Sequence, residues 1–368
     1  MHKKISFAGP WITQKEIDYV VDAVKNGWYE TFFKDIKALE TTMAEYVGRK
    51  YALATHCCTL SLHLSAASLG LKKGDEVICP DFSWVATATS VAYTGATLVF
   101  VDIDPDTWNI DPKAIERAVN DKTKAIMLVH TFGNPSDMNP IMETAKKYNL
   151  AVIEDAAPAL GAQYKGRKVG GFGDFGCFSF HGAKIAASGE GGILLTDNKD
   201  LYDRASLLAS MGRTDRKAVF WADEIGYQYT IGNMAAALAR AQVERIDELV
   251  ARKRQIFNWY YERLKDVPGF KFIKEKEGCF SNYCYPSALL GDNFKVDRDD
   301  VLAQLREHNI HFRPAFPRMS LFPMFEQRYP NPEAEKAERR GISLASAANL
   351  DEEDIDFTCK TLLKILKV

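Results

Sequence analysis

The sequence predicts an α/β protein with a mostly parallel sheet, and three observations support this. Short apolar or β-branched runs alternate with helical segments between Tyr51 and about residue 197. These runs are apolar at consecutive positions, which is typical of strands covered on both faces. With 368 residues and 46% hydrophobic content, the chain is long enough to bury a sizeable core. Ligands of such sheets bind at the carboxyl ends of the strands, so functional residues are expected there.

Two helices are expected before the alternating region that begins at Tyr51. Thr13 and Glu16 have capping-box spacing and begin an amphipathic helix that ends at Gly27. An aromatic segment at 28–33 follows, which suits either the core or a wall or subunit contact, and a second helix is predicted over 36–46.

Strands and helices then alternate along the chain. A helix opens at residues 57–59 and ends at Gly70. The expected strands are 76–80, 97–104, 124–130, 150–155, 177–180 and 191–196, and the helices between them are 83–93, 112–119 and 141–148.

The remaining chain predicts a bridging helix and a smaller α+β unit. One long charged helix is expected over 233–264, followed by strands, a helix over 296–309 and a final helix from Glu352. We therefore expect a large domain at 13–245 and a small domain at 246–368, with residues 1–12 packing on the small domain.

Composition excludes several classes of function. The formal net charge is -2, from 47 basic and 49 acidic residues that are well interspersed, so neither nucleic acid nor an anionic membrane is indicated as a partner. The seven cysteines contain no CxxC pair, and we expect neither disulfides nor a metal site. No signal-peptide pattern or long apolar run occurs, so the cytoplasm is the expected location.

A single lysine, Lys184, stands in the glycine-rich loop of the segment CFSFHGAKIAASGEGG, residues 177–192. A partly desolvated amine in such a loop can lose its charge and attack a carbonyl group. Most loop lysines are simply solvated, so the neighbouring residues decide the interpretation.

Other candidates lie near strand ends or helix starts. Asp155 ends a strand, where it either caps the next helix or pairs with a pyridinium nitrogen. Cys58 and Thr59 open a helix whose free N–H groups suit a phosphate, to which Ser179 adds a hydroxyl. Trp84 follows a strand and either belongs to the core or covers one face of an aromatic ring.

The order of these residues carries a resemblance. Thr59, Trp84, Asp155 and the spacing Ser179-x-x-x-x-Lys184 before GEGG resemble the DegT-type nucleotide-sugar aminotransferases. Segments such as GDEVICP, VIEDAAPALGA and GYQYTIGNMAAALARAQVERID extend the resemblance over nearly the whole chain. The C-4 aminotransferases are the most similar branch.

The resemblance implies a fold and a cofactor. The fold would be that of fold type I pyridoxal-phosphate enzymes, with a mostly parallel seven-stranded sheet in the large domain and a smaller C-terminal α+β domain. Lys184 would bind pyridoxal 5'-phosphate covalently and move the proton, Asp155 would hold the pyridine nitrogen, and Trp84 would stack on the ring.

The resemblance also implies the phosphate and substrate contacts. Cys58, Thr59 and Ser179 would hold the phosphate together with Asn233 of a partner subunit, which places active sites at the interface of a homodimer. His181 is a candidate proton carrier, substrate ligand or structural residue. The candidate substrate contacts are Glu190, Arg313 and Arg318.

Four positions depart from the pattern of the family. Cys58 stands where glycine is common, and Pro158 replaces a glutamine or glutamate that helps to hold the cofactor. Thr230 replaces an arginine, and Ser320 replaces a histidine near the substrate. These departures concern the substrate more than the cofactor.

The implied reaction transfers the amino group of L-glutamate to a keto-sugar in two half-reactions, and the expected acceptor is a nucleotide-linked 4-keto-6-deoxy sugar. A keto-cyclitol or a small phosphorylated ketone is the alternative acceptor. A sugar 3-dehydratase is disfavoured because Lys184 is present and the cysteines are scattered. A non-catalytic regulator on the same fold is the remaining alternative.

Overall fold

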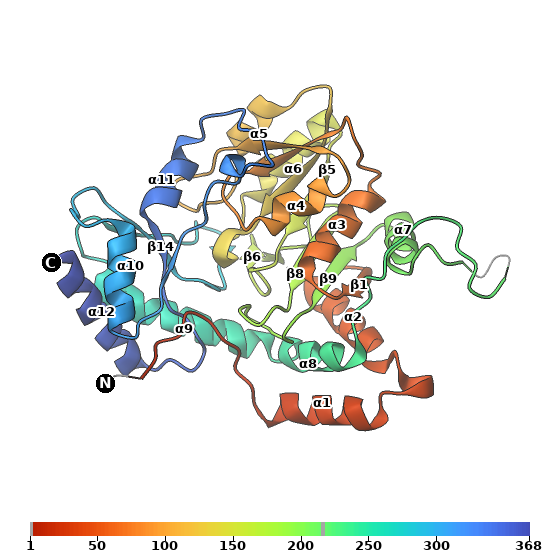
Figure 1. The fold of residues 1–368 in the computed structure, drawn as a ribbon, viewed down its shortest axis with the longest axis horizontal. Helices are drawn as coiled ribbons and strands as arrows, with labels where there is room; N and C mark the ends of the chain where they lie inside the picture. The colour runs from red at the N-terminus through yellow and green to blue at the C-terminus, as the bar shows by residue number, and fades with distance from the viewer. Residues whose placement is uncertain (1–2, 215–217) are drawn as a thin grey trace.

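A computed structural model describes residues 3–214 and 218–368 of the chain. In these residues the central sheet has seven strands in the order β1-β9-β8-β5-β4-β2-β3 (Figure 1). Its strands are β1 (Tyr51–Thr55), β2 (Glu76–Pro80), β3 (Thr97–Val101), β4 (Thr123–Val129), β5 (Ala151–Asp155), β8 (Phe175–Ser179) and β9 (Gly192–Thr196).

The predicted mostly parallel sheet is confirmed. Strands β3, β2, β4, β5 and β8 pair in parallel, whereas β9 is antiparallel to both β8 and β1. Strand β1 is not among the expected strands, because its five residues lie just before the helix that begins at Cys58. The parallel arrangement brings several strand ends to one edge of the sheet, as a ligand site requires.

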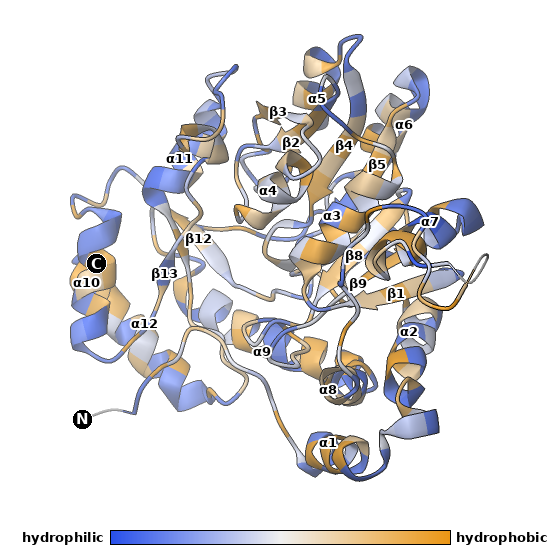
Figure 2. Ribbon diagram, turned by 45° about the vertical axis from the view of Figure 1, so that its right-hand side comes forward, coloured by the Kyte–Doolittle hydropathy of each residue, from blue (hydrophilic) through white to orange (hydrophobic). Residues whose placement is uncertain are grey.

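Helices cover both faces of this sheet. Alternate side chains of β5 show the two layers, since Ile153 packs in one apolar cluster and Val152 in the other. The first face carries α3 (Cys58–Ser68), α4 (Ala86–Ala92) and α7 (Lys199–Ala209). The second carries α2 (Lys34–Val47), α5 (Pro112–Ala118), α6 (Met138–Tyr148) and α8 (Asn233–Val243). The strands between them are largely hydrophobic (Figure 2).

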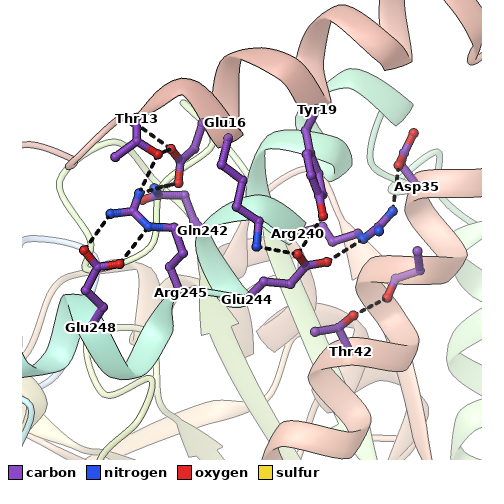
Figure 3. Close-up of polar contacts among 12 residues, drawn as sticks. Thr13, Glu16, Tyr19, Asp35, Thr42, Arg240, Gln242, Glu244, Arg245 and Glu248 are labelled. Atoms are coloured by element: carbon purple, nitrogen blue, oxygen red, sulfur yellow. Dashed lines mark hydrogen bonds and ion pairs between the residues drawn. The ribbon is translucent and has the colours of Figure 1, made fainter.

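Helix α1 (Gln14–Asn26) lies against α8 and begins with the predicted capping box of Thr13 and Glu16. Glu16 is buried and also accepts a hydrogen bond from Gln242 (2.8 Å) and pairs with Arg245 (2.6 Å; Figure 3). One polar network therefore fastens the start of α1 to the end of α8.

The prediction of one long helix over 233–264 is wrong. The chain forms two helices, α8 and α9 (Ile246–Leu264). Glu244 and Arg245 lie between them and belong to neither helix. At this break the side chains of Gln242 and Arg245 both donate to the carbonyl of Trp11. Helix α9 then runs from the central sheet toward the C-terminal elements (Figure 1).

The C-terminal elements form a second, antiparallel sheet in the order β10-β12-β14-β13. Its strands are β10 (Phe270–Phe272), β12 (Ser287–Leu290), β13 (Arg313–Pro314) and β14 (Gly341–Ser343), and its helices are α10 (Arg298–Glu307), α11 (Pro332–Arg340) and α12 (Glu352–Leu366). Ile5 forms a parallel bridge with Ile310 beside this sheet. The division at residue 245 stays a prediction, and residues 1–2 lie outside the described residues.

Several short elements were not expected from the sequence. A small sheet joins β6 (Gln163–Tyr164), β7 (Arg167–Lys168) and β11 (Cys279–Phe280) in the order β11-β6-β7. The 3-10 helices are η1 (Tyr29–Thr31), η2 (Thr131–Gly133) and η3 (Met319–Leu321). The aromatic segment at 28–33 is exposed at Trp28, Tyr29, Phe32 and Phe33 rather than buried in the core. None of the described helices has the length and apolar character needed to cross a membrane.

Candidate active site

A pocket of about 420 Å³ lies at the carboxyl ends of the parallel strands. Its lining brings together most of the residues singled out in the sequence, although they are far apart along the chain. These residues are Cys58, Thr59, Trp84, Asp155, Ser179, His181, Lys184, Glu190 and Arg313.

Lys184 stands in the loop between β8 and β9, and backbone hydrogen bonds fix this loop. The N–H of Lys184 donates to the carbonyl of His181 (2.8 Å), and Gly182 donates to Gly189 (2.9 Å). The Lys184 ammonium lies 5.5 Å from the ring centre of Tyr285, whose hydroxyl donates to the carbonyl of Ala183. The loop therefore holds the amine against an aromatic wall of the pocket.

Asp155 is the buried acid of the pocket, with 5% of its surface exposed. Its carboxylate accepts hydrogen bonds from the hydroxyl of Thr87 (2.7 Å) and the backbone N–H of Ala157 (3.1 Å). Both donors are neutral, and burial raises the pKa of Asp155 despite them and the charge of Lys184. A cationic partner in the pocket would stabilise this carboxylate.

The start of α3 forms another part of the wall. Cys57 is the N-cap residue and provides no side-chain hydrogen bond to the helix. Gly192 passes so close that a Cβ there would lie 2.4 Å from the N atom of Cys58. Burial, with the charge of Asp155, raises the pKa of the Cys58 thiol well above its ordinary value, so this thiol stays protonated. The helix start thus offers backbone N–H groups to an anion without a competing thiolate.

Aromatic side chains form the remaining walls. Trp84 is 62% exposed and its ring centre lies 6.3 Å from that of Phe316. Phe7 stacks on Tyr285 with ring centres 5.1 Å apart, and Phe132 packs against Phe316 at 5.0 Å. A flat ligand would therefore find apolar faces beside the buried Asp155.

The mouth of the pocket is polar and exposed. His181 lies 3.6 Å from a carboxylate oxygen of Glu190, and both side chains are more than half exposed. The guanidinium of Arg313 lies 4.5 Å from the ring centre of Phe7. The exposed side chains of His181, Glu190 and Arg313 can therefore contact a substrate at the solvent-facing side of the pocket.

Two predicted site residues do not line this pocket. Arg318 is buried in ion pairs with Glu338 (3.1 Å) and Glu335 (3.8 Å) and donates to the carbonyl of Pro330. Asn233 is the buried first residue of α8, and its Oδ1 accepts the N–H of Asp35 (3.1 Å). Arg318 is therefore engaged elsewhere in this chain.

Similarity to known proteins shows the family to which the chain belongs. The family model of the DegT/DnrJ/EryC1/StrS aminotransferases matches residues 10–363. The chain belongs to this family. GDP-perosamine synthase of Escherichia coli O157:H7 is 37% identical over 361 residues, which cover 98% of each protein. A putative pyridoxal phosphate-dependent aminotransferase, EpsN of Bacillus subtilis, is 34% identical and covers 99% of this chain and 96% of its own length.

Solved structures of aminotransferases have the same fold. The aminotransferase TlmJ from Streptoalloteichus hindustanus superposes with a TM-score of 0.93 at 28% identity over 99% of both chains. PseC of Helicobacter pylori, an aminotransferase of pseudoaminic acid biosynthesis, gives 0.91 at 25% identity over 99% of this chain and all of its own (100%). As a member of the family, the chain is a pyridoxal-phosphate-dependent aminotransferase with the predicted fold.

The pocket of this DegT-type aminotransferase fits its cofactor. Lys184 offers an amine for the aldehyde, and the start of α3 offers N–H groups for the phosphate. The hydrogen-bond donors of Asp155 in the described part of the chain are neutral, so the protonated pyridine nitrogen would supply a positive charge beside this carboxylate.

The structure shows the hydrogen bonds of three of the four residues that depart from the family pattern, namely Pro158, Thr230 and Ser320. The carbonyl of Pro158 accepts a hydrogen bond from Asn282 at 2.9 Å, and Pro158 lines the pocket. Thr230 accepts one from Gln228, and Ser320 donates to Asp81 (2.7 Å), but neither lines the pocket. Thr230 and Ser320 therefore act on the pocket, if at all, through their neighbours.

Sequence reasoning missed several residues of the site. Thr87 follows Trp84 by three positions, and its place on the next helix could have suggested contact with a strand end. Phe7, Phe132, Tyr285 and Phe316 line the pocket from four separate segments, and no local pattern distinguishes them from core aromatics.

Proposed function

We propose that this aminotransferase moves the amino group of L-glutamate onto the keto group of a nucleotide-linked 4-keto-6-deoxy sugar in the cytoplasm. The observation that carries the proposal is that Lys184 and Asp155 line the same pocket in a chain of this family. The similarity to GDP-perosamine synthases over nearly the full length supports a sugar acceptor.

The residues of the pocket that we predicted to contact the cofactor have proposed roles, namely Cys58, Thr59, Trp84, Asp155, Ser179 and Lys184. Pyridoxal phosphate, when bound, supplies an aldehyde and a ring that withdraws electrons from the reacting carbon. Lys184 binds this group and then carries a proton to or from the substrate carbon at its Nζ atom. Asp155 would keep the ring nitrogen protonated, and Trp84 would cover one face of the ring. Backbone and hydroxyl groups at Thr59 and Ser179, next to Cys58, hold the phosphate.

The mouth residues have a proposed task at the substrate. His181 and Glu190 face each other beside Lys184, so they suit contacts to sugar hydroxyls or to the glutamate that enters first. Arg313 suits a carboxylate or phosphate, because its guanidinium presents several donors in a fixed plane. Arg318 is not proposed for this task, since its ion pairs hold it away from the pocket.

The central experiment tests the lysine. Purified protein should be yellow, and borohydride reduction should attach the cofactor permanently to Lys184. Lys184→Ala should abolish turnover with glutamate, whereas Lys199→Ala removes an exposed lysine paired with Asp203 and should leave turnover unchanged. A colourless protein that never takes up the cofactor would count against the proposal.

The acceptor is tested separately with labelled glutamate. Transfer of label to a nucleotide-linked keto-sugar supports the proposal, whereas exclusive transfer to a keto-cyclitol or a small phosphorylated ketone selects that alternative. Bound cofactor with no reaction toward glutamate would favour a non-catalytic regulator.

We also propose that the enzyme is a homodimer and that Asn233 reaches the phosphate of the partner subunit. Exposed apolar side chains beside this residue support a covered surface, namely Met234 on α8 and Ile17, Val21 and Val24 on α1. Mixed dimers of Lys184→Ala and Asn233→Ala chains test the arrangement, because one of their two sites would contain neither change. Activity recovered on mixing supports a shared site, and inactive mixed dimers contradict it.

A further inference from the structure

A second hollow, of about 500 Å³, opens beside the Lys184 pocket. The two hollows share the side chains of Phe7, His181 and Arg313, and Ala183 lies between them next to Lys184. A molecule seated in the second hollow would therefore reach the amine of Lys184 with its other end.

The lining of the second hollow is basic. Lys4, Arg306, His311 and Arg313 contribute to it together with His181, and no aspartate or glutamate of the described residues does. Within residues 3–214 and 218–368, none of Lys4, Arg306 and Arg313 forms an ion pair with a carboxylate. Burial and the charges of Lys4 and Arg306 lower the pKa of His311, as expected for a site of positive potential.

The backbone around the hollow is fixed rather than loose. Ile5 donates to the carbonyl of Asn309 (2.9 Å) and accepts the N–H of His311 (3.0 Å). Ser346 donates to the carbonyl of Phe7 (2.7 Å), which holds the N-terminal segment against the C-terminal sheet. Two segments distant in sequence are thus held with the cations of Lys4, Arg306 and Arg313 around one space, an arrangement that costs electrostatic repulsion when empty.

We propose that this hollow binds the phosphate groups of the keto substrate, whose sugar then extends past Ala183 to Lys184. This inference rests on the proposed transfer to a keto acceptor and deepens it by assigning the anionic end of that acceptor. A multiply charged phosphate ester or diphosphate suits the hollow better than the carboxylate of glutamate, because several cations face one space.

The test measures binding of simple probes to the holoenzyme by titration calorimetry. The probes are inorganic phosphate, inorganic pyrophosphate and GDP. Binding of pyrophosphate and GDP more tightly than phosphate supports a diphosphate-linked acceptor, whereas equal binding of phosphate selects a small phosphorylated ketone. If no probe binds, the inference is wrong.

Variants locate the binding. Lys4→Met combined with Arg306→Met should weaken pyrophosphate and GDP binding roughly 10- to 100-fold, the range expected for losing charge-assisted hydrogen bonds. Arg339→Met removes an exposed arginine of α11 that does not line the hollow, and it should leave binding unchanged. Equal binding by the double variant and the wild type would overturn the inference.

Two further measurements keep the result interpretable. If the double variant does not fold, the wild type still tests the inference, because its pyrophosphate affinity should fall steeply between about 50 and 500 mM salt. Salt-independent binding contradicts a basic site. The conversion of wild-type cofactor by glutamate is measured in parallel, and its failure would overturn the proposed function rather than the phosphate site.

Discussion

Glu154 and Asp155 are neighbours at the end of β5, yet they face opposite sides of the sheet in very different surroundings. Glu154 is completely buried and accepts the backbone N–H groups of Gly170 (2.7 Å), Phe172 (2.6 Å) and Gly173 (2.7 Å). It also accepts a hydrogen bond from His130 (3.0 Å). Among the described residues, Asp155 by contrast accepts hydrogen bonds from Thr87 and Ala157 alone.

The pKa directions follow from these partners. Burial acts to raise the pKa of both carboxyl groups, but the hydrogen bonds of His130 and the backbone keep the pKa of Glu154 below its ordinary value. His130 accepts the N–H of Ser136 at Nδ1, so its Nε2 carries the proton given to Glu154. The pKa of Asp155 is raised. Hydrogen bonds within the chain thus stabilise the carboxylate of Glu154. The carboxylate of Asp155 in the pocket would be stabilised further by a cation.

Glu154→Gln should have the largest effect, and on stability. The amide would turn a donor toward backbone N–H groups, so we expect a loss of about 3–5 kcal/mol in the free energy of unfolding. Urea unfolding measures it, with the exposed Glu143→Gln on α6 as control. A loss no larger than that of the control would contradict the role assigned to Glu154.

Asp155→Asn should act on catalysis instead. Removing the negative charge that we propose pairs with the ring nitrogen should slow the reaction with glutamate roughly 10²–10³-fold, about 2.7–4 kcal/mol. The melting temperature should not fall, because a buried charge disappears and the Thr87 hydroxyl can turn to accept from the new amide. Rapid-mixing absorbance of the cofactor measures the rate.

Asp81 provides the comparison for this variant. It is also buried directly after a strand, but Ser320 and Asn331 satisfy it away from the pocket. Asp81→Asn should therefore slow the reaction with glutamate much less. Equal losses in both variants would mean that the pocket does not distinguish Asp155.

Glu16→Gln extends the comparison to the α1 network. Burial opposes ionisation, but the hydrogen bonds of Thr13, Arg245 and Gln242 lower the pKa of Glu16 to about 2. Its stabilising contribution is complete above pH 4.5 and is lost as the pH falls toward 2. At neutral pH the variant should lose about 1.5–3 kcal/mol. The difference from wild type in urea unfolding should shrink at pH 3, and a constant difference would contradict this.

Glu40→Gln should have the smallest effect and the opposite sign. Glu40 is a poorly satisfied carboxylate outside the pocket, since its hydrogen bond is from the N–H of Ala54 (2.9 Å) and burial raises its pKa to about 7. Wild-type stability should therefore fall as the pH rises from 4.5 to 7. Glutamine keeps the acceptor, so the variant should be more stable by about 1 kcal/mol at pH 8 and equal at pH 4.5. Unchanged stability at pH 8 would show that Glu40 is well solvated.

The comparison also shows what sequence could predict. Asp155 ends β5, Thr59 lies in the first turn of α3 and Lys184 follows β8, and the parallel sheet brings such positions to one edge. The break between α8 and α9 could not be predicted, because glutamate and arginine at 244 and 245 favour helices and the contacts of Arg245 at the break, with Trp11 and Glu16, are distant in sequence.

Side-chain partners distant in sequence were equally hidden. Arg318 looked like a substrate ligand until the structure paired it with Glu335 and Glu338 on α11. Lys4 and Arg306 both line the basic hollow although they lie far apart in the sequence, and neither position is unusual in its local context. Such sites depend on tertiary packing rather than on periodicity.

The segment from Arg313 to Ser320 is fixed at both ends to different sheets. Arg313 pairs with Ser343 in β14, while the backbone and hydroxyl of Ser320 bind Asp81 just after β2. An insertion or deletion between these anchors would displace Arg313 from the mouth of the pocket or pull Ser320 from Asp81. Over evolutionary time, the length of this segment should therefore be held more strictly than the identity of the residues within it.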